Sequence, residues 1–318
     1  MEAMKPKLTA IAPWFGGKRT LSDKIVAQLG DHDQYFEPFC GSMAIVLAKE
    51  PCQQEIVNDL HGDVTNLAWV LQGPKTAEEL YDRAARTLFC EDMIRAFWED
   101  VARNPCPSHV DTDRAFKYLV SSWVMRNGVA GTTRAATDGF QIAVRFTLTG
   151  GSPTRRFTSV VESIPAWHYR LRNVMILRRN AFKLLSKFSD HKDLAIYADP
   201  PYMPETRSGF FAKGAKSHYE HEFNHTKKNN LSFADEEEST VDHHELLRDA
   251  LSTFKEARVV VSYYDCERVR ELYQGWTFIE SPMQKNLNCA AGRGDRQKTA
   301  NEVLIINGDP FELPTKAK

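Results

Sequence analysis

The pattern of apolar and polar residues near the start of the chain predicts a strand, a helix and a second strand. Apolar runs at residues 35–39 and 55–59 have the composition of β-strands and lie on either side of a turn at 40–42 and a helical stretch at 44–50. The same alternation returns after residue 174. Strands are predicted there at 174–179, 194–198 and 258–265, and helices at 181–188 and 242–254. Strands that alternate with helices indicate an α/β fold with a mostly parallel sheet.

The middle of the chain has a helical pattern instead. Residues 63–72 and 76–103 show helical periodicity with charged residues on one side, and we expect exposed helices there, with Thr76 as a capping residue. Another helix is predicted to begin at Asp111 or Thr112 and to end at 127–128, where Asn is followed by Gly.

Two β-like runs follow within residues 141–161, around a turn at 150–153, and they predict an arginine-rich β-hairpin. The chain is therefore divided into a sheet domain, formed by residues 1–66 and 175–318, and an inserted module of helices and a hairpin at 67–174. A polar segment at 203–232 is long for a loop inside a domain, which is typical of a functional lid.

Composition places the chain among ordinary globular proteins. It has 318 residues, of which 42% are hydrophobic and 26% are charged, enough for about two domains. We find no run of roughly 20 apolar residues and no apolar leader at the start, so we expect a cytoplasmic protein that does not enter a membrane. The six cysteines are scattered, and we expect reduced thiols.

Taken as a whole, the net charge of −1 argues against a strongly basic nucleic-acid-binding protein, but the charge is unevenly distributed. Between Arg114 and Asn180, eleven Lys and Arg residues face two acidic residues, a local charge of +9, and the rest of the chain carries −10. Ten of these eleven are Arg, whose planar fork suits phosphates and guanine edges. The insertion therefore has the charge of a phosphate-binding surface, although an arginine-rich protein interface is an alternative.

Three histidines, His218, His221 and His225, have the close spacing of some zinc ligands. They stand in a polar segment with no Cys or fourth ligand nearby, and we expect no metal.

The sequence Asp199-Pro200-Pro201-Tyr202 follows directly on the buried strand predicted at 194–198. The two prolines fix the chain as it leaves the sheet, at the edge where open α/β sheets bind ligands. For methyl transfer to an exocyclic amine, Asp199 and the Pro200 carbonyl can both accept hydrogen bonds from the NH2 group. These bonds draw the nitrogen lone pair out of conjugation, and Tyr202 can stack on the base.

On these residues the chain resembles the DNA adenine methylase family, N6-adenine methyltransferases with a D-P-P-Y motif. Trp14-Phe15-Gly16-Gly17-Lys18 is similar to the family's W-x-G-G-K segment, and residues 36–42, FEPFCGS, are similar to its strand and turn. Asn58-Asp59 places an acid after the second strand, with the spacing of a ribose-binding acid. One position departs from the family, which often has Gly where this chain has Met43.

The resemblance implies a Rossmann-like methyltransferase domain that uses S-adenosylmethionine and an insertion that recognises DNA. It assigns catalysis to Asp199, Pro200, Pro201 and Tyr202. It assigns cofactor binding to Trp14, Phe15, Gly16, Gly17, Lys18, Glu37, Pro38, Phe39, Gly41, Ser42, Asp59 and Asp199. Candidate DNA contacts are Arg126, Asn127, Arg134, Arg145, Arg155 and Arg156.

The resulting hypothesis is methyl transfer to N6 of an adenine flipped out of double-stranded DNA, without a covalent enzyme intermediate. N4-cytosine methylation, protein-glutamine methylation, an RNA substrate and a catalytically silent DNA-binding protein are the alternatives, and the Asp at position 199 favours adenine. The recognition sequence, the oligomeric state and the biological role, as a housekeeping, restriction-partner or bacteriophage enzyme, stay open at this point.

Overall fold

The computed structural model describes residues 6–14, 16–124, 142, 153–203, 242–281 and 301–312. Within these residues one sheet of seven strands forms the centre of the molecule, in the order β3-β2-β1-β4-β5-β7-β6. The strands are β1 (Gln34–Glu37), β2 (Gln54–Asn58), β3 (Val174–Leu177), β4 (Leu194–Ala198), β5 (Arg258–Tyr264), β6 (Thr277–Ser281) and β7 (Glu302–Ile306). The five strands predicted from the apolar runs are confirmed.

The pairings from β3 through β5 are parallel, and among the described strands only β7 runs in the opposite direction, between β5 and β6. The strand order reverses at β1, whose neighbours are β2 on one side and β4 on the other. A crevice forms at such a switch point, beyond the carboxyl ends of the strands, because the connections leave in opposite directions. β1 ends at Glu37 and β4 ends next to Asp199. The topology therefore brings two segments that are far apart in the sequence to the same crevice.

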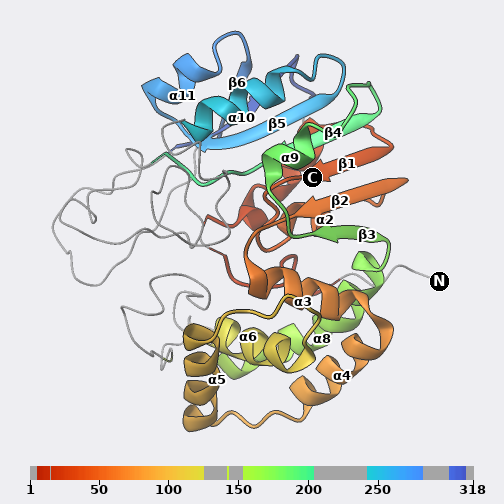
Figure 1. The fold of residues 1–318 in the computed structure, drawn as a ribbon, viewed down its shortest axis with the longest axis vertical. Coiled ribbons are helices and arrows are strands. Elements are labelled where there is room, and N and C mark those ends of the chain that lie inside the picture. The colour runs from red at the N-terminus through yellow and green to blue at the C-terminus, as the bar shows by residue number, and fades with distance from the viewer. Residues whose placement is uncertain are drawn as a thin grey trace, which may run out of the picture.

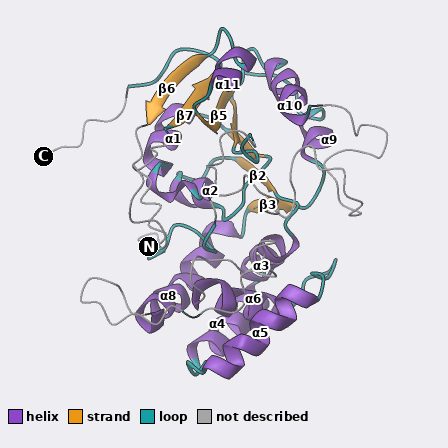
Figure 2. Cartoon of the chain, turned by 90° about the vertical axis from the view of Figure 1, so that its left-hand side faces the viewer, coloured by secondary structure: helices purple, strands orange, loops and turns teal. Residues whose placement is uncertain are grey.

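Helices cover both faces of the sheet (Figure 2). α1 (Ser22–Leu29) and α2 (Ala44–Ala48) lie on one side, and α9 (Ala181–Leu185) and α10 (His243–Ser252) lie on the other, with α11 (Glu267–Leu272) nearby. β4 is buried along its whole length and contributes to both sides, since successive side chains of a strand alternate. Ala195 and Tyr197 join the core with α1 and α2, while Leu194, Ile196 and Ala198 join the core with α9 and α10.

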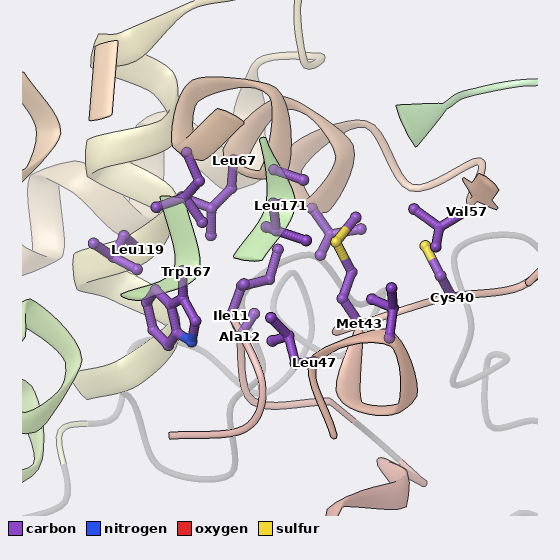
Figure 3. Packing of buried hydrophobic residues seen from close by; sticks show 14 of the residues in the cluster. Ile11, Ala12, Cys40, Met43, Leu47, Val57, Leu67, Leu119, Trp167 and Leu171 are labelled. Carbon is purple, nitrogen blue, oxygen red and sulfur yellow. The ribbon is translucent and has the colours of Figure 1, made fainter. Parts of the chain in front are cut away.

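Five helices form a bundle beside the sheet (Figure 1). They are α3 (Gly62–Gln72), α4 (Pro74–Ala85), α5 (Glu91–Arg103), α6 (Thr112–Val124) and α8 (Pro153–Leu171). Their apolar residues belong to the same core as α1 and α2. In Figure 3, Trp167 and Leu171 of α8 lie near Ile11 of the N-terminal segment. The bundle and the sheet are therefore joined by continuous packing, and the predicted domain boundary at residue 66 falls inside α3.

The predicted hairpin is wrong over its second half. Residues 153–171 form the long helix α8, while the first half lies outside the described residues apart from Ile142. Pro153 occupies the start of the helix, where its missing N–H costs nothing. The buried apolar side chains recur at helical spacing through Phe157, Val160, Val161, Ile164, Trp167 and Leu171. The β-branched residues favoured a strand locally, but burial of this face decides the structure.

The predicted helices at 63–72 and 76–103 are confirmed, with three corrections. α3 is buried on all sides rather than exposed, because α4, α6 and α8 pack against it. The second stretch is two helices, α4 and α5, separated by residues 86–90. Thr76 does not cap α4, because Gly73 is the N-cap and Pro74 follows it, while the Thr76 hydroxyl donates to the Val70 carbonyl at 2.7 Å.

The predicted start of the next helix is confirmed. The Asp111 carboxylate accepts a hydrogen bond from the backbone N–H of Arg114 at 2.9 Å, which is the role of a capping residue at the start of α6. None of the described helices has the length and apolar character needed to cross a membrane.

Candidate active site

A pocket lies at the carboxyl ends of β1, β2 and β4. It is lined by Trp14, Gly17, Lys18, Glu37, Phe39, Cys40, Gly41, Ser42, Ala44, Ile45, Asp59, Leu60, His61, Tyr197, Asp199 and Pro201. The lining thus unites three segments that the sequence analysis selected separately: residues 14–18, 37–42 and 199–201.

The turn after β1 shapes one wall of the pocket. Gly41 has φ +45°, and a Cβ atom there would lie 2.6 Å from Nε1 of Trp14. A side chain at this position would therefore push the indole away, so the turn requires glycine for both its conformation and its space. The backbone N–H of Gly41 donates to Oδ2 of Asp59 at 2.8 Å.

Asp59 is fixed at the end of β2 by its neighbours. Its Oδ1 accepts from the backbone N–H of His61 at 2.8 Å, while its Oδ2 accepts from Gly41. The adjacent Asn58 donates from Nδ2 to the carbonyls of Pro38 and Arg179, both at 3.0 Å, and so ties β2 to its two neighbouring turns. The carboxylate is held in the pocket wall with lone pairs left for a hydroxyl donor.

His61 was not selected from the sequence, although it lines the pocket. Its ring lies 5.2 Å from that of Trp14 in an edge-to-face arrangement, and it caps α3 by accepting from the Val64 N–H. A histidine directly before a helix gives no signal that it lines a pocket.

The backbone of Met43 is in the left-handed region, with φ 63° and ψ 28°. Among the described residues, it is the only one other than glycine with a positive φ. This is the position at which the chain departs from the family's glycine. Its side chain is fully buried in the core near Leu47 (Figure 3). The burial of the thioether thus offsets the backbone strain.

Asp199 follows β4 and has two buried partners. Its Oδ1 accepts from Oγ of Ser262 on β5 at 2.8 Å, and its Oδ2 lies 2.9 Å from Nζ of Lys18. Burial raises the pKa of Asp199, while the Lys18 charge opposes the rise. Ser262 in turn contacts the Tyr197 hydroxyl at 2.9 Å, so the carboxylate belongs to a fixed hydrogen-bond network.

Lys18 lines the pocket, and its ammonium is directed at Asp199 and Tyr202 of the D-P-P-Y segment. Nζ donates to the Gly16 carbonyl at 2.6 Å, lies 3.4 Å from Oε1 of Glu302, and stands 4.8 Å from the centre of the Tyr202 ring. Burial disfavours the charged form, but Asp199 and Glu302 outweigh it and raise the pKa of Lys18. The ammonium is therefore a buried cation shared by two carboxylates.

Glu302, at the start of β7, completes this cluster and was not selected from the sequence. The Tyr202 hydroxyl donates to its Oε1 at 2.8 Å, and the residue is 2% exposed. Tyr202 is equally buried and packs edge-on against Tyr264 at 4.4 Å between ring centres. The sequence does carry one indication of this residue: an acid directly before a fully apolar run. An acidic side chain at such a buried position is almost always paired.

Glu37, at the end of β1, accepts a hydrogen bond from the Tyr35 hydroxyl at 2.8 Å. Burial raises the pKa of its carboxyl well above the ordinary value, against the effect of that bond. Behind it, Lys49 and Glu55 form a buried ion pair at 2.6 Å, and Arg170 of α8 binds the same Glu55 carboxylate with both nitrogens of its fork. This cluster ties the helical bundle to β2.

Several predicted residues lie outside the described part of the chain. These are Phe15, Arg126, Asn127, Arg134, Arg145, the three histidines and all but the first residue of the 203–232 segment. In the part that is described, no three His, Cys, Asp or Glu residues are grouped as metal ligands. Arg155 and Arg156 are exposed on the first turn of α8.

The strand order, the glycine turn after β1, the acid after β2 and the anchored Asp199 after β4 define an α/β methyltransferase. The chain belongs to the D12 class N6 adenine-specific DNA methyltransferase family, whose sequence model matches residues 14–287. It is also 22% identical over 317 residues to a protein of Haemophilus influenzae (strain ATCC 51907 / DSM 11121 / KW20 / Rd) named DNA adenine methylase. That match covers 96% of this chain and 97% of the relative. The protein is therefore a DNA adenine methyltransferase.

Proposed function

We propose that this enzyme transfers a methyl group from S-adenosylmethionine to N6 of an adenine that has been flipped out of double-stranded DNA. The observation that carries the proposal is the position of Asp199, which follows β4 at the sheet's switch point and lines the same pocket as Gly41 and Asp59. A base must leave the duplex to reach such a recessed carboxylate, at a cost of a few kcal/mol.

The pocket fits S-adenosylmethionine in its chemistry. Asp59 has the position of a ribose-binding acid after β2, and Trp14 and Phe39 provide apolar walls. The carboxyl groups of Glu37 and Asp199 place polar oxygen atoms in the pocket wall. The missing Cβ of Gly41 makes room for the Trp14 indole, which lines the pocket. When bound, the cofactor supplies an electrophilic methyl group.

Asp199 has the role of hydrogen-bond acceptor for the adenine amine. Ser262 and Lys18 each hold one of its oxygens, so the carboxylate does not need to reorganise when the base arrives. Together with the Pro200 carbonyl it draws electron density toward N6, which then acts as the nucleophile. The N6–CH3 bond would form as the S–CH3 bond of the cofactor breaks, N6 would release one proton to solvent, and no bond to the enzyme is needed.

Lys18 and Glu302 are positioning residues in this proposal. Lys18 fixes Asp199, and Glu302 fixes both Lys18 and the hydroxyl of Tyr202. Stacking of the base on Tyr202 requires this ring to gain exposure, because it is 2% exposed with the Lys18 ammonium over it.

The insertion at residues 67–174 is the proposed DNA-recognition module. The positive charge of residues 114–180, most of which lie in this insertion, supports this role, as do Arg155 and Arg156, which α8 presents to solvent. We further propose that Arg126, Asn127, Arg134 and Arg145 contribute to the same surface.

The test is transfer of labelled methyl groups to unmethylated duplex DNA by wild-type enzyme and by Asp199→Ala. We expect transfer to be abolished in this variant and DNA binding to be retained. Asp193→Ala is the matched control, because this exposed residue directly precedes the opposite end of β4. Transfer by Asp199→Ala at the wild-type rate would exclude the catalytic assignment, and labelled cytosine in the digested DNA would favour N4-cytosine methylation.

A further inference from the structure

A second, more open hollow adjoins the active-site pocket. It shares Trp14, Gly17 and Ser42 with that pocket. Two arginines from distant parts of the chain line it: Arg19 of the short helix η1 (Lys18–Thr20) and Arg156 of α8. The hollow is thus the rim of the catalytic pocket.

The polar lining of the hollow is entirely basic or neutral. Thr9, Thr20 and Ser42 contribute hydroxyl groups, and no Asp or Glu takes part. Among the described residues, neither Arg19 nor Arg156 forms an ion pair, although acidic residues pair with most arginines of the neighbouring bundle. Partial burial of the Arg156 guanidinium lowers its pKa, and the nearby charge of Arg19 lowers it further. Two unpaired guanidinium groups around one hollow are a binding arrangement for an anion.

Arg156 is also held in place. Its guanidinium lies 4.9 Å from the centre of the Trp123 ring of α6, which is a cation–π contact. Arg155 is exposed on the same turn of α8 but does not line the hollow. Arg19 follows Lys18 directly, so a ligand bound to Arg19 lies beside the residue that holds Asp199. Of the two neighbouring arginines of α8, Arg156 therefore lines the hollow and Arg155 does not.

We propose that Arg19 and Arg156 together bind one backbone phosphate of the DNA substrate at the rim of the catalytic pocket. This inference rests on the proposed function, since the phosphate belongs to the strand that carries the flipped adenine. Base flipping rotates a nucleotide about its backbone, so a phosphate beside the target must be held at the pocket mouth. The paired forks of two arginines and the neighbouring hydroxyls match the oxygens of a phosphate.

The test uses the full-length enzyme, a duplex with an adenine that it methylates, and the variants Arg19→Ala, Arg156→Ala and their combination. Arg155→Ala is the matched control. Duplex affinity is measured against salt concentration, and cofactor affinity is measured separately by calorimetry. A series of duplexes with a single neutral methylphosphonate then locates the phosphate.

We expect each single variant to bind the duplex about tenfold more weakly at low salt. The double variant should lower the slope of log affinity against log salt by about 0.9, the value of one phosphate, because both arginines bind the same group. One methylphosphonate position should weaken wild-type binding and leave the double variant unaffected.

Three results would overturn the inference. None of them affects the proposed function, provided that the wild-type enzyme methylates DNA. The first is an effect of Arg156→Ala no larger than that of Arg155→Ala. The second is a slope change of about 1.8 in the double variant, which indicates two separate phosphates. The third is weakened cofactor binding with unchanged duplex binding, which would assign the rim to the cofactor carboxylate. Absence of methyl transfer by the wild-type enzyme would instead refute the proposed function.

Discussion

Nζ of Lys18 lies 2.9 Å from Oδ2 of Asp199, which joins the first described helical turn of the chain to the end of β4. The ammonium is 4% exposed, so its charge acts on Asp199 with little screening by water. The ionised Asp199 carboxylate is a stronger hydrogen-bond acceptor for an amine than the protonated acid. If Asp199 has the proposed role, the surroundings of this pair therefore influence the pH range of activity.

Replacing Lys18 with Met should shift the acidic limb of the pH–rate profile to higher pH. Burial already raises the pKa of Asp199 above its ordinary 3.8, and Lys18 is the charge that lowers it. Activity is present above the folded-state pKa and is lost as the pH falls through it, so loss of the cation moves this limb upward. Profiles of kcat/KM for wild type and Lys18→Met measure the shift. Identical limbs would show that Lys18 does not control Asp199.

Replacing Glu302 with Gln should move the same limb in the opposite direction. The Glu302 charge raises the pKa of Asp199, and the amide removes that charge while its oxygen can still accept from the Tyr202 hydroxyl. Glu302→Ala, which removes both, should lower kcat further than Glu302→Gln. If the two variants behave alike and neither shifts the limb, Glu302 has a purely structural role.

Gly41→Ala should weaken cofactor binding about 10- to 100-fold, because the new methyl group displaces the Trp14 indole from the pocket wall. Calorimetric titration with S-adenosylmethionine measures this loss. Gly275→Ala is the control for backbone strain, since Gly275 has φ +89° and nothing within 4 Å of an added Cβ. Equal affinity in Gly41→Ala and wild type would remove Trp14 from the binding site.

Glu55→Gln should lower the free energy of unfolding by roughly 3–5 kcal/mol. Glu55 balances two buried cations, Lys49 at 2.6 Å and Arg170 at 2.6 Å, and both lose their counter-charge in the variant. Urea unfolding compared with Glu50→Gln, an exposed neighbour, measures the difference. A loss under 1 kcal/mol would mean that water or another group neutralises the cations.

Met43→Gly should lower the free energy of unfolding by about 1–3 kcal/mol. Glycine removes the strain of the left-handed backbone, which stabilises the fold by roughly 1–2 kcal/mol. Loss of the fully buried Met side chain destabilises it by about 2–5 kcal/mol. Thermal and urea unfolding both report the balance. Stabilisation by the glycine would show that strain, not packing, dominates at this position.

The sequence predicted the part of the site that lies within single segments. The residues of 14–18, 37–42 and 199–202 are each coded locally, as a turn, a strand end or a proline-fixed exit, and the described members of each come together at the switch point. The missed residues depend on sheet register. Ala198 pairs with Val261 and Tyr264 pairs with Glu302, which places Ser262 beside Asp199 and Glu302 near Tyr202. The register between neighbouring strands cannot be read from one sequence alone.

The hairpin prediction failed for a related reason. Residues 157–161 contain Phe, Thr and two Val, all favourable in strands, and the helical spacing becomes visible only when Ile164 and Trp167 are included. The packing of a long apolar helix face on α3, α4 and α6 outweighed the local strand propensity of these residues.

β7 follows β6 in the sequence but lies between β5 and β6 in the sheet. Folding therefore cannot add the strands in the order of synthesis: β6 has no described partner until β7 inserts beside it and brings Glu302 to Lys18. An emerging polypeptide that already contains the D-P-P-Y motif still lacks the carboxylate that holds its tyrosine. The strand that completes the described sheet therefore also completes the buried cluster of Lys18, Asp199, Tyr202 and Glu302.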